Sequence, residues 1–248
     1  MYELIINADD FGLNESCTKA ICQAFSEGLI TDTTMVANGT AFVEAVECIQ
    51  KLGLQNKIGI HFNLTEGKPL TRAIASMPTF SENGVFHGKI NRVKQLSKAE
   101  KSAVYEELSA QIEKLEKAGV EISHADSHHH IHTGIFIASI FVQVCKEHGI
   151  NKVRLHRNIG SISKIKQIVK KLYNQWLHTE GFKTTEFFGS MEDAERTGVR
   201  DRVEIMVHPG FDRHGNLIDK VDEVDGYAVG KLLSLPTGEF ILRGYKDL

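Results

Sequence analysis

Short apolar runs that alternate with longer amphipathic stretches constrain the fold of this chain more than any other sequence feature. Residues 4–8, 33–37 and 58–64 have the length and the content of buried parallel strands. Residues 14–27 and 41–52 lie between these runs and have the character of helices, each followed by a glycine. Strands that alternate with helices in this way predict parallel βαβ units.

The same alternation continues through the rest of the chain. Residues 79–96 read as a long loop, and Ser97 with Glu100 forms a capping box that begins a helix. Further strands are predicted at residues 120–126, 152–155, 185–188, 203–207 and 240–242. Because the chain has 248 residues, we predict one α/β domain over residues 1–248, a distorted (β/α) TIM-like barrel with seven or eight parallel strands.

Net charge and cysteine content indicate which binding partners and which cellular compartment to expect. The net charge is −3 without a long run of one sign, so we expect neither a nucleic-acid nor a membrane partner. The N-terminal residues MYELIINADD read as a strand and not as a secretory signal. The four cysteines have no C-x-x-C spacing and are expected to be isolated, unpaired residues. These features predict a cytoplasmic protein.

Reactive residues follow several of the predicted strands. Active sites of parallel barrels lie at the C-terminal ends of the strands, where such residues meet on one rim. They are Asp9-Asp10 after the first strand, His61 and Asn63 in the third, the histidine-rich residues 124–132 after the fourth, and His208 before Pro209-Gly210. We therefore predict one site built from distant parts of the chain.

The Asp9-Asp10 pair has two interpretations. Adjacent carboxylates repel each other unless a cation lies between them, which favours a metal site. The alternative is an Asx-type turn in which Asp10 caps the following helix. His61 also has two interpretations, because a histidine in an apolar strand is either a buried core residue or a metal ligand.

Alternation along residues 124–132 makes this segment the more specific signal. While the chain stays extended, five residues share one side and His129 faces the other way; the five are His124, Asp126, His128, His130 and His132. Such a face is costly to bury without a charged partner, so we favour metal binding over an exposed loop. Asp126 would then orient a ligand histidine. The spacing does not choose the ligand.

Two further residues are candidates for catalysis. His208 is either an ordinary turn residue or a general acid, because histidine titrates near neutral pH. Arg154 lies near the end of the predicted strand at 152–155 and either orients Asp9 through a bidentate pair or forms a surface ion pair.

Four segments together resemble the YdjC-like carbohydrate deacetylases, a family that includes chitooligosaccharide deacetylases. The segments are INADDFG at 6–12, GIHFNLTEGKPL at 59–70, HADSHHHIH at 124–132 and MVHPGF at 206–211, and the similarity continues to the final RGYKDL. The resemblance implies a distorted barrel related to polysaccharide deacetylases. It also assigns metal ligation to Asp10, His61 and His128, the catalytic base to Asp9, and the histidine of an HP motif to His208.

The reaction implied by the resemblance is hydrolysis of an N-acetyl group from a small amino-sugar oligosaccharide such as diacetylchitobiose, with release of acetate, in chitin degradation. One divalent ion is expected. The resemblance implies Mg²⁺, whereas one carboxylate and two imidazoles suit Zn²⁺ or another transition metal. A homodimer is expected from the resemblance alone. Residues expected to orient ligands or substrate are Asn63, Asp126, His130 and Arg154.

Two other functions fit the same residues. A metal-dependent phosphoesterase would use additional ligands, for which His124, His130 and His132 are available. A non-catalytic metal-binding or sugar-binding protein is the other alternative. Asp9 and His208 favour an enzyme, because simple binding needs neither a base nor an acid.

Overall fold

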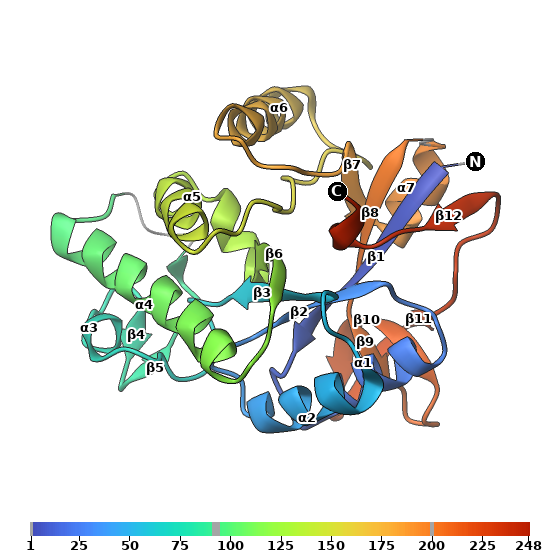
Figure 1. The fold of residues 1–248 in the computed structure, drawn as a ribbon, viewed down its shortest axis with the longest axis horizontal. Helices are drawn as coiled ribbons and strands as arrows, with labels where there is room; N and C mark the ends of the chain where they lie inside the picture. Colours follow the sequence, from blue (N-terminus) through green and yellow to red (C-terminus); the bar gives the residue numbers. More distant parts are fainter. Residues whose placement is uncertain (1, 91–94, 199–200) are drawn as a thin grey trace.

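The computed structural model describes residues 2–90, 95–198 and 201–248, which form a sheet of parallel strands flanked by helices (Figure 1). The order of strands is β6-β3-β2-β1-β8-β7, and β12 pairs with the first half of β1. All of these pairings are parallel, which confirms the predicted α/β class. The strands are β1 (Tyr2–Phe11), β2 (Asp32–Met35), β3 (Ile58–Phe62), β6 (Ile122–Ser127), β7 (Phe187–Ser190), β8 (Arg202–Val207) and β12 (Phe240–Leu242).

Two isolated parallel bridges continue the sheet from the edge strand β6 toward the other edge strand, β7. Ala125 of β6 pairs with Val153, and Lys152 pairs with Lys183, shortly before β7 begins. The sheet therefore forms a distorted barrel, as predicted. The strand predicted at residues 152–155 is reduced to these single bridges, although Val153 and Arg154 are fully buried and fill its place in the barrel wall.

Helices lie outside the strands, and local sequence signals set several of their ends. Asn14 caps α1 by accepting a hydrogen bond from the backbone N–H of Cys17, so Asp10 is not the cap. The capping box of Ser97 and Glu100 begins α4 as predicted. The helices are α1 (Glu15–Ser26), α2 (Phe42–Leu52), α3 (Arg72–Ala75), α4 (Lys98–Lys117), α5 (Ala138–Glu147), α6 (Lys164–Thr179) and α7 (Met191–Thr197).

Two antiparallel additions were not predicted. The expected loop over residues 79–96 contains a short pair, β4 (Ser81–Glu82) and β5 (Val85–Phe86). After β8 the chain enters a separate antiparallel sheet, β9 (Pro209–Phe211), β10 (Leu217–Val224) and β11 (Tyr227–Leu232). Asp225 and Gly226 connect β10 to β11 with φ angles of 53° and 79°. An Asp-Gly pair between strands is a hairpin signal, so this addition was detectable.

The cysteines differ from the prediction. Cys22 of α1 and Cys48 of α2 form a disulfide, whereas Cys17 and Cys145 are free. The pairing joins residues 26 positions apart in the sequence, and it depends on the packing of α1 against α2, which spacing alone does not show. Among the described residues, no helix is long and apolar enough to cross a membrane.

Candidate active site

A bulge at the end of β1 brings the carboxylates of two neighbouring residues, Asp9 and Asp10, to one site. The pairing of β1 with β2 shifts between Ala8 and Phe11, so β1 contains an extra residue there. Asp10 has a φ of 72°, a left-handed conformation that residues with a side chain rarely adopt. On a regular strand Asp9 and Asp10 would face opposite sides. The bulge explains how both reach the rim of the barrel.

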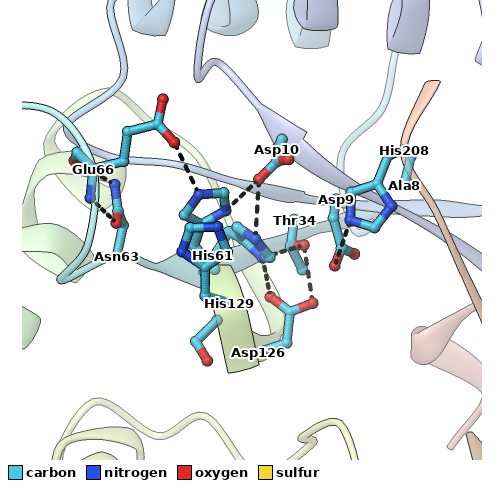
Figure 2. Close-up of polar contacts among 12 residues, drawn as sticks. Ala8, Asp9, Asp10, Thr34, His61, Asn63, Glu66, Asp126, His129 and His208 are labelled. Atoms are coloured by element: carbon cyan, nitrogen blue, oxygen red, sulfur yellow. Dashed lines mark hydrogen bonds and ion pairs between the residues drawn. The ribbon is translucent and has the colours of Figure 1, made fainter. Parts of the chain in front are cut away.

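His61 comes to this rim from β3 and is oriented by Asp126 of β6 (Figure 2). Oδ1 of Asp126 lies 2.6 Å from Nδ1 of His61 and accepts a hydrogen bond from it, and Oγ1 of Thr34 lies 3.0 Å from the same nitrogen. Nε2 of His61 is therefore left facing Oδ1 of Asp10, 3.2 Å away. This carboxylate–imidazole pair presents one ring nitrogen toward the site, as ligand histidines do.

His128 approaches the same oxygen of Asp10 from the other side. Its Nδ1 lies 2.8 Å from Oδ1 of Asp10, and its Nε2 lies 3.2 Å from Glu66, a loop residue that the sequence analysis did not single out. The two imidazoles thus have similar surroundings. In each ring one nitrogen faces Asp10, and the other faces a second carboxylate, Asp126 for His61 and Glu66 for His128. The side chains of Asp10, His61 and His128 form a group that could hold a metal ion.

The atoms of this group fit a divalent cation. Oδ1 of Asp10 is buried, and within the described residues no donor makes a hydrogen bond of acceptable geometry to it, although two ring nitrogens lie close by. Burial lowers the pKa of His61 and His128, but the facing carboxylates raise it to about 10 and about 9. A site in which two imidazoles gain protons beside a carboxylate is one that attracts positive charge. One carboxylate and two imidazoles are suitable ligands for a metal ion.

A second group of possible ligands, Asp9, His61 and Asp126, lies next to the first. Both of its carboxylates already pair with Arg154, whose Nη1 lies 2.7 Å from Asp9 and 2.6 Å from Asp126. A metal ion there would compete with a fully buried guanidinium group. We therefore favour the Asp10 group.

Asp9 is held by the strongest set of interactions in the site. Nη1 and Nη2 of Arg154 each donate to one oxygen of Asp9 at 2.7 Å, and Asn7 donates to Oδ1 at 3.0 Å. Burial raises the pKa of Asp9, but Arg154 lowers it well below its usual range, so the carboxylate is ionised. Of the two predicted roles of Arg154, the bidentate pair is correct and the surface pair is wrong.

His208 lies at the mouth of the site, where β8 ends. Its backbone N–H donates to Asp219 of β10, and its Nε2 lies 4.0 Å from Oδ2 of Asp9. The side chain is 36% exposed, whereas Asp9 is almost fully buried. His208 and Asp9 thus face the same point from the solvent side and from the interior.

The histidine-rich segment departs from its prediction. The chain stays extended only to Ser127 and then forms a 3₁₀ turn, η2 (His128–Thr133), because His129 and His130 have φ angles of 51° and 53°. Period-two alternation therefore ends at Ser127, and His129 lines the same cleft as His128 and does not face away from it.

The remaining predicted residues lie at different depths. His124 and His132 are buried in the interior. His130 lies in the cleft wall, and its Nδ1 has no hydrogen-bond partner among the residues that the structure describes. Asn63 uses its amide group to shape the loop after β3, where it bonds to Asn38 and to the backbone of Glu66. Asn63 is thus a loop residue that places Glu66.

The site opens into a cleft of about 480 Å³. Residues of β1, β3 and η2 line it together with His208, which follows β8, and β10 supplies Lys220 and Glu223, which sequence reasoning missed. The hairpin turn at Asp225-Gly226 was the signal that could have found them. This cleft is large enough for part of a small oligosaccharide.

Comparison with known proteins shows the family to which the chain belongs. Residues 3–229 match the model of a family described as YdjC-like protein. The chain belongs to the YdjC-like family. This YdjC-like chain is 30% identical over 210 residues to carbohydrate deacetylase 1 of Listeria innocua. The match covers 84% of the chain and 82% of the relative. It is 32% identical over 206 residues to a carbohydrate deacetylase of Oceanobacillus iheyensis, with 83% and 84% covered.

A solved structure supports the same fold. A crystal structure of an Enterococcus faecalis protein, provisionally described as a cellobiose-phosphate cleavage protein, superposes with a TM-score of 0.67. It shares 26% sequence identity, and the match covers 85% of this YdjC-like chain and 82% of the other. The expected family and the expected barrel are thus both confirmed.

Proposed function

We propose that this chain is a metal-dependent hydrolase that removes an N-acetyl group from a small acetylated amino-sugar oligosaccharide such as diacetylchitobiose and releases acetate. The coarser statement, an enzyme that deacetylates a carbohydrate, follows from the family and from relatives that are carbohydrate deacetylases. The finer statement is supported by one observation: an ionised, buried Asp9 lies beside the Asp10, His61 and His128 group in an open cleft.

The residues divide into ligands, a base and an acid. Asp10, His61 and His128 would hold the cation, which supplies polarisation of the acetamide carbonyl and a lowered pKa of water. Asp9 accepts the proton of the attacking water, since Arg154 keeps it ionised and its carboxylate lies within 4.8 Å of a ring nitrogen of His61. His208 donates a proton to the departing amine nitrogen, which is otherwise a poor leaving group.

The two alternative functions have less support. Of the three extra ligands predicted for a phosphoesterase, His124 and His132 are buried outside the cleft, and His130 alone lines it. A simple binding protein would not need the strained backbone of Asp10 or the buried Asp9–Arg154 pair. A homodimer and a cytoplasmic location stay predictions.

The proposed function is tested by the products released from a panel of substrates. We expect acetate from N,N′-diacetylchitobiose or another N-acetylated sugar, because Asp9 as base, His208 as acid and a cation held by Asp10, His61 and His128 would together cleave an acetamide. Acetate and inorganic phosphate would be measured in parallel on acetylated and phosphorylated disaccharides. Phosphate release without acetate release would contradict the proposal and favour the phosphoesterase.

The proposed acid has its own test. His208→Ala is expected to lower kcat by about a hundredfold, because the amine would leave unprotonated. Since the side chain is 36% exposed, added imidazole should reach the gap and restore part of kcat. Steady-state acetate release with and without imidazole measures both effects. A wild-type kcat in the variant would exclude His208 as the acid.

A further inference from the structure

Tyr245 is far in the sequence from the residues that line the cleft. In the fold its side chain lies in the interior, where it contacts residues that hold Asp9 in place. It begins the C-terminal 3₁₀ turn η3 (Tyr245–Asp247), beyond residues 3–229 that match the family model. The side chain is fully buried. Its hydroxyl donates to Oε2 of Glu204 at 2.6 Å, and its ring stacks on His124 with 3.7 Å between centroids and 6° between planes.

The first connection from Tyr245 runs through Glu204 to Arg154. Oε1 of Glu204 accepts a hydrogen bond from Nε of Arg154 at 2.7 Å, while the other guanidinium nitrogens bind Asp9 and Asp126. Burial raises the pKa of Glu204 to about 7, although Arg154 and Tyr245 both favour its ionised form. One guanidinium group therefore binds three buried carboxylates, and Tyr245 holds one of them, Glu204, which does not line the cleft.

The second connection runs through His124 to Asn7. Nε2 of His124 lies 3.0 Å from Oδ1 of Asn7, whose Nδ2 donates to Asp9 at 3.0 Å and to Thr34 at 3.2 Å. Because the amide nitrogen of Asn7 is the donor to Asp9, its oxygen accepts from His124. The stacked ring of Tyr245 limits the tilt of His124. Both groups that hold Asp9, Arg154 and Asn7, are thus supported by Tyr245.

The position of Tyr245 is itself well defined. The backbone N–H of Tyr245 donates to Oδ1 of Asp32 at 3.0 Å, and the preceding Arg243 donates its backbone N–H to Leu4 of β1. A Cβ on Gly244 would lie 3.1 Å from Oδ2 of Asp32, so this passage has little room for a side chain. The C-terminal segment is therefore fixed against β1 and β2, the strands next to the base.

We propose that Tyr245 and Glu204 are positioning residues that hold Arg154, and through it Asp9 and Asp126, in the geometry needed for catalysis. The inference rests on the proposed function for the role of Asp9. It adds that the C-terminal segment completes the active site from below. Because Asp126 orients the ligand His61, the same residues also affect the cation site.

The test compares variants that keep or remove the hydrogen bonds. Tyr245→Phe keeps the stacked ring and is expected to lower kcat about tenfold at saturating Zn²⁺, with KM within about twofold, since ground-state contacts to substrate are unchanged. Glu204→Ala should lower kcat further. Glu204→Gln should recover most of that loss, because its amide oxygen can accept from Arg154. Zn²⁺ titrated into metal-free Tyr245→Phe should bind about threefold more weakly.

Tyr105→Phe is the matched control, because Tyr105 also donates to a glutamate, Glu147, but on the surface between α4 and α5. It should keep wild-type kcat and Zn²⁺ affinity. A wild-type kcat in Tyr245→Phe would overturn the inference while acetate release by the wild type upholds the proposed function. If the wild type released no acetate, the proposed function would fail, and equal Zn²⁺ affinities of wild type and Tyr245→Phe would then overturn the inference.

Discussion

Asp9→Asn is expected to lower kcat by about a thousandfold while the protein keeps its divalent cation. Asparagine has nearly the same shape as aspartate but cannot accept the proton of the attacking water. Asp9 is not one of the favoured metal ligands, and Arg154 keeps its contacts with Asp126 and Glu204, so the variant should fold. Steady-state acetate release measures kcat, and elemental analysis of the same sample measures metal content.

Metal content separates a lost base from a lost site in this experiment. A variant without metal would mean that Asp9 belongs to the ligand set, as in the adjacent group of Asp9, His61 and Asp126. Turnover within about tenfold of wild type would mean that Asp9 is not the base, since positioned proton transfer contributes more than that.

His128→Ala is expected to lose the metal and the activity together. In the proposed site His128 would supply one of three ligand atoms, and it also lies between Asp10 and Glu66. Without it the two remaining ligands, Asp10 and His61, form an incomplete set. Metal content after dialysis and acetate release on the same protein are the measurements.

His129→Ala is the matched control for this prediction. His129 is the neighbouring histidine in the same cleft, and its Nδ1 lies 3.0 Å from Oγ1 of Thr65 and outside the ligand group. This variant should keep wild-type metal content. Reconstitution of metal-free wild type with Zn²⁺ and with Mg²⁺ would identify the metal. An unchanged metal content in His128→Ala would contradict the ligand assignment.

Local patterns were sufficient to predict most of the barrel. The apolar runs of β1 and β3 and the capping box of α4 depend on neighbouring residues only, and all three are present. The segment after Ser127 was predicted wrongly, because polar alternation indicates an extended chain and nothing in HHHIH signals two left-handed residues. The Cys22–Cys48 disulfide depends on which helices pack together, which a single sequence does not specify.

The residues of the candidate site were predictable from the sequence, but most of the buried residues that hold them in place were not. Residue types at strand ends indicated Asp10, His61 and Asp9, and the family resemblance selected His128. The bidentate Asp9–Arg154 pair was one of two alternatives, since a side chain in a strand enters the barrel or leaves it according to register. The further contacts of Arg154 with Asp126 and Glu204 were not predicted. Glu204 lies in an apolar stretch and Tyr245 in the last residues, and only the folded chain brings them beneath Asp9.

Metal-dependent deacetylation is measured by acetate release from N,N′-diacetylchitobiose in metal-free and in metal-reconstituted protein. We expect no release after chelation, and recovery when Zn²⁺ or Mg²⁺ is added back, because Asp10, His61 and His128 would again hold the cation beside Asp9. A panel of other N-acetylated sugars in the same assay would detect activity if the enzyme acts on a sugar other than diacetylchitobiose. Acetate release that persists at the wild-type rate in fully metal-free protein would contradict the account.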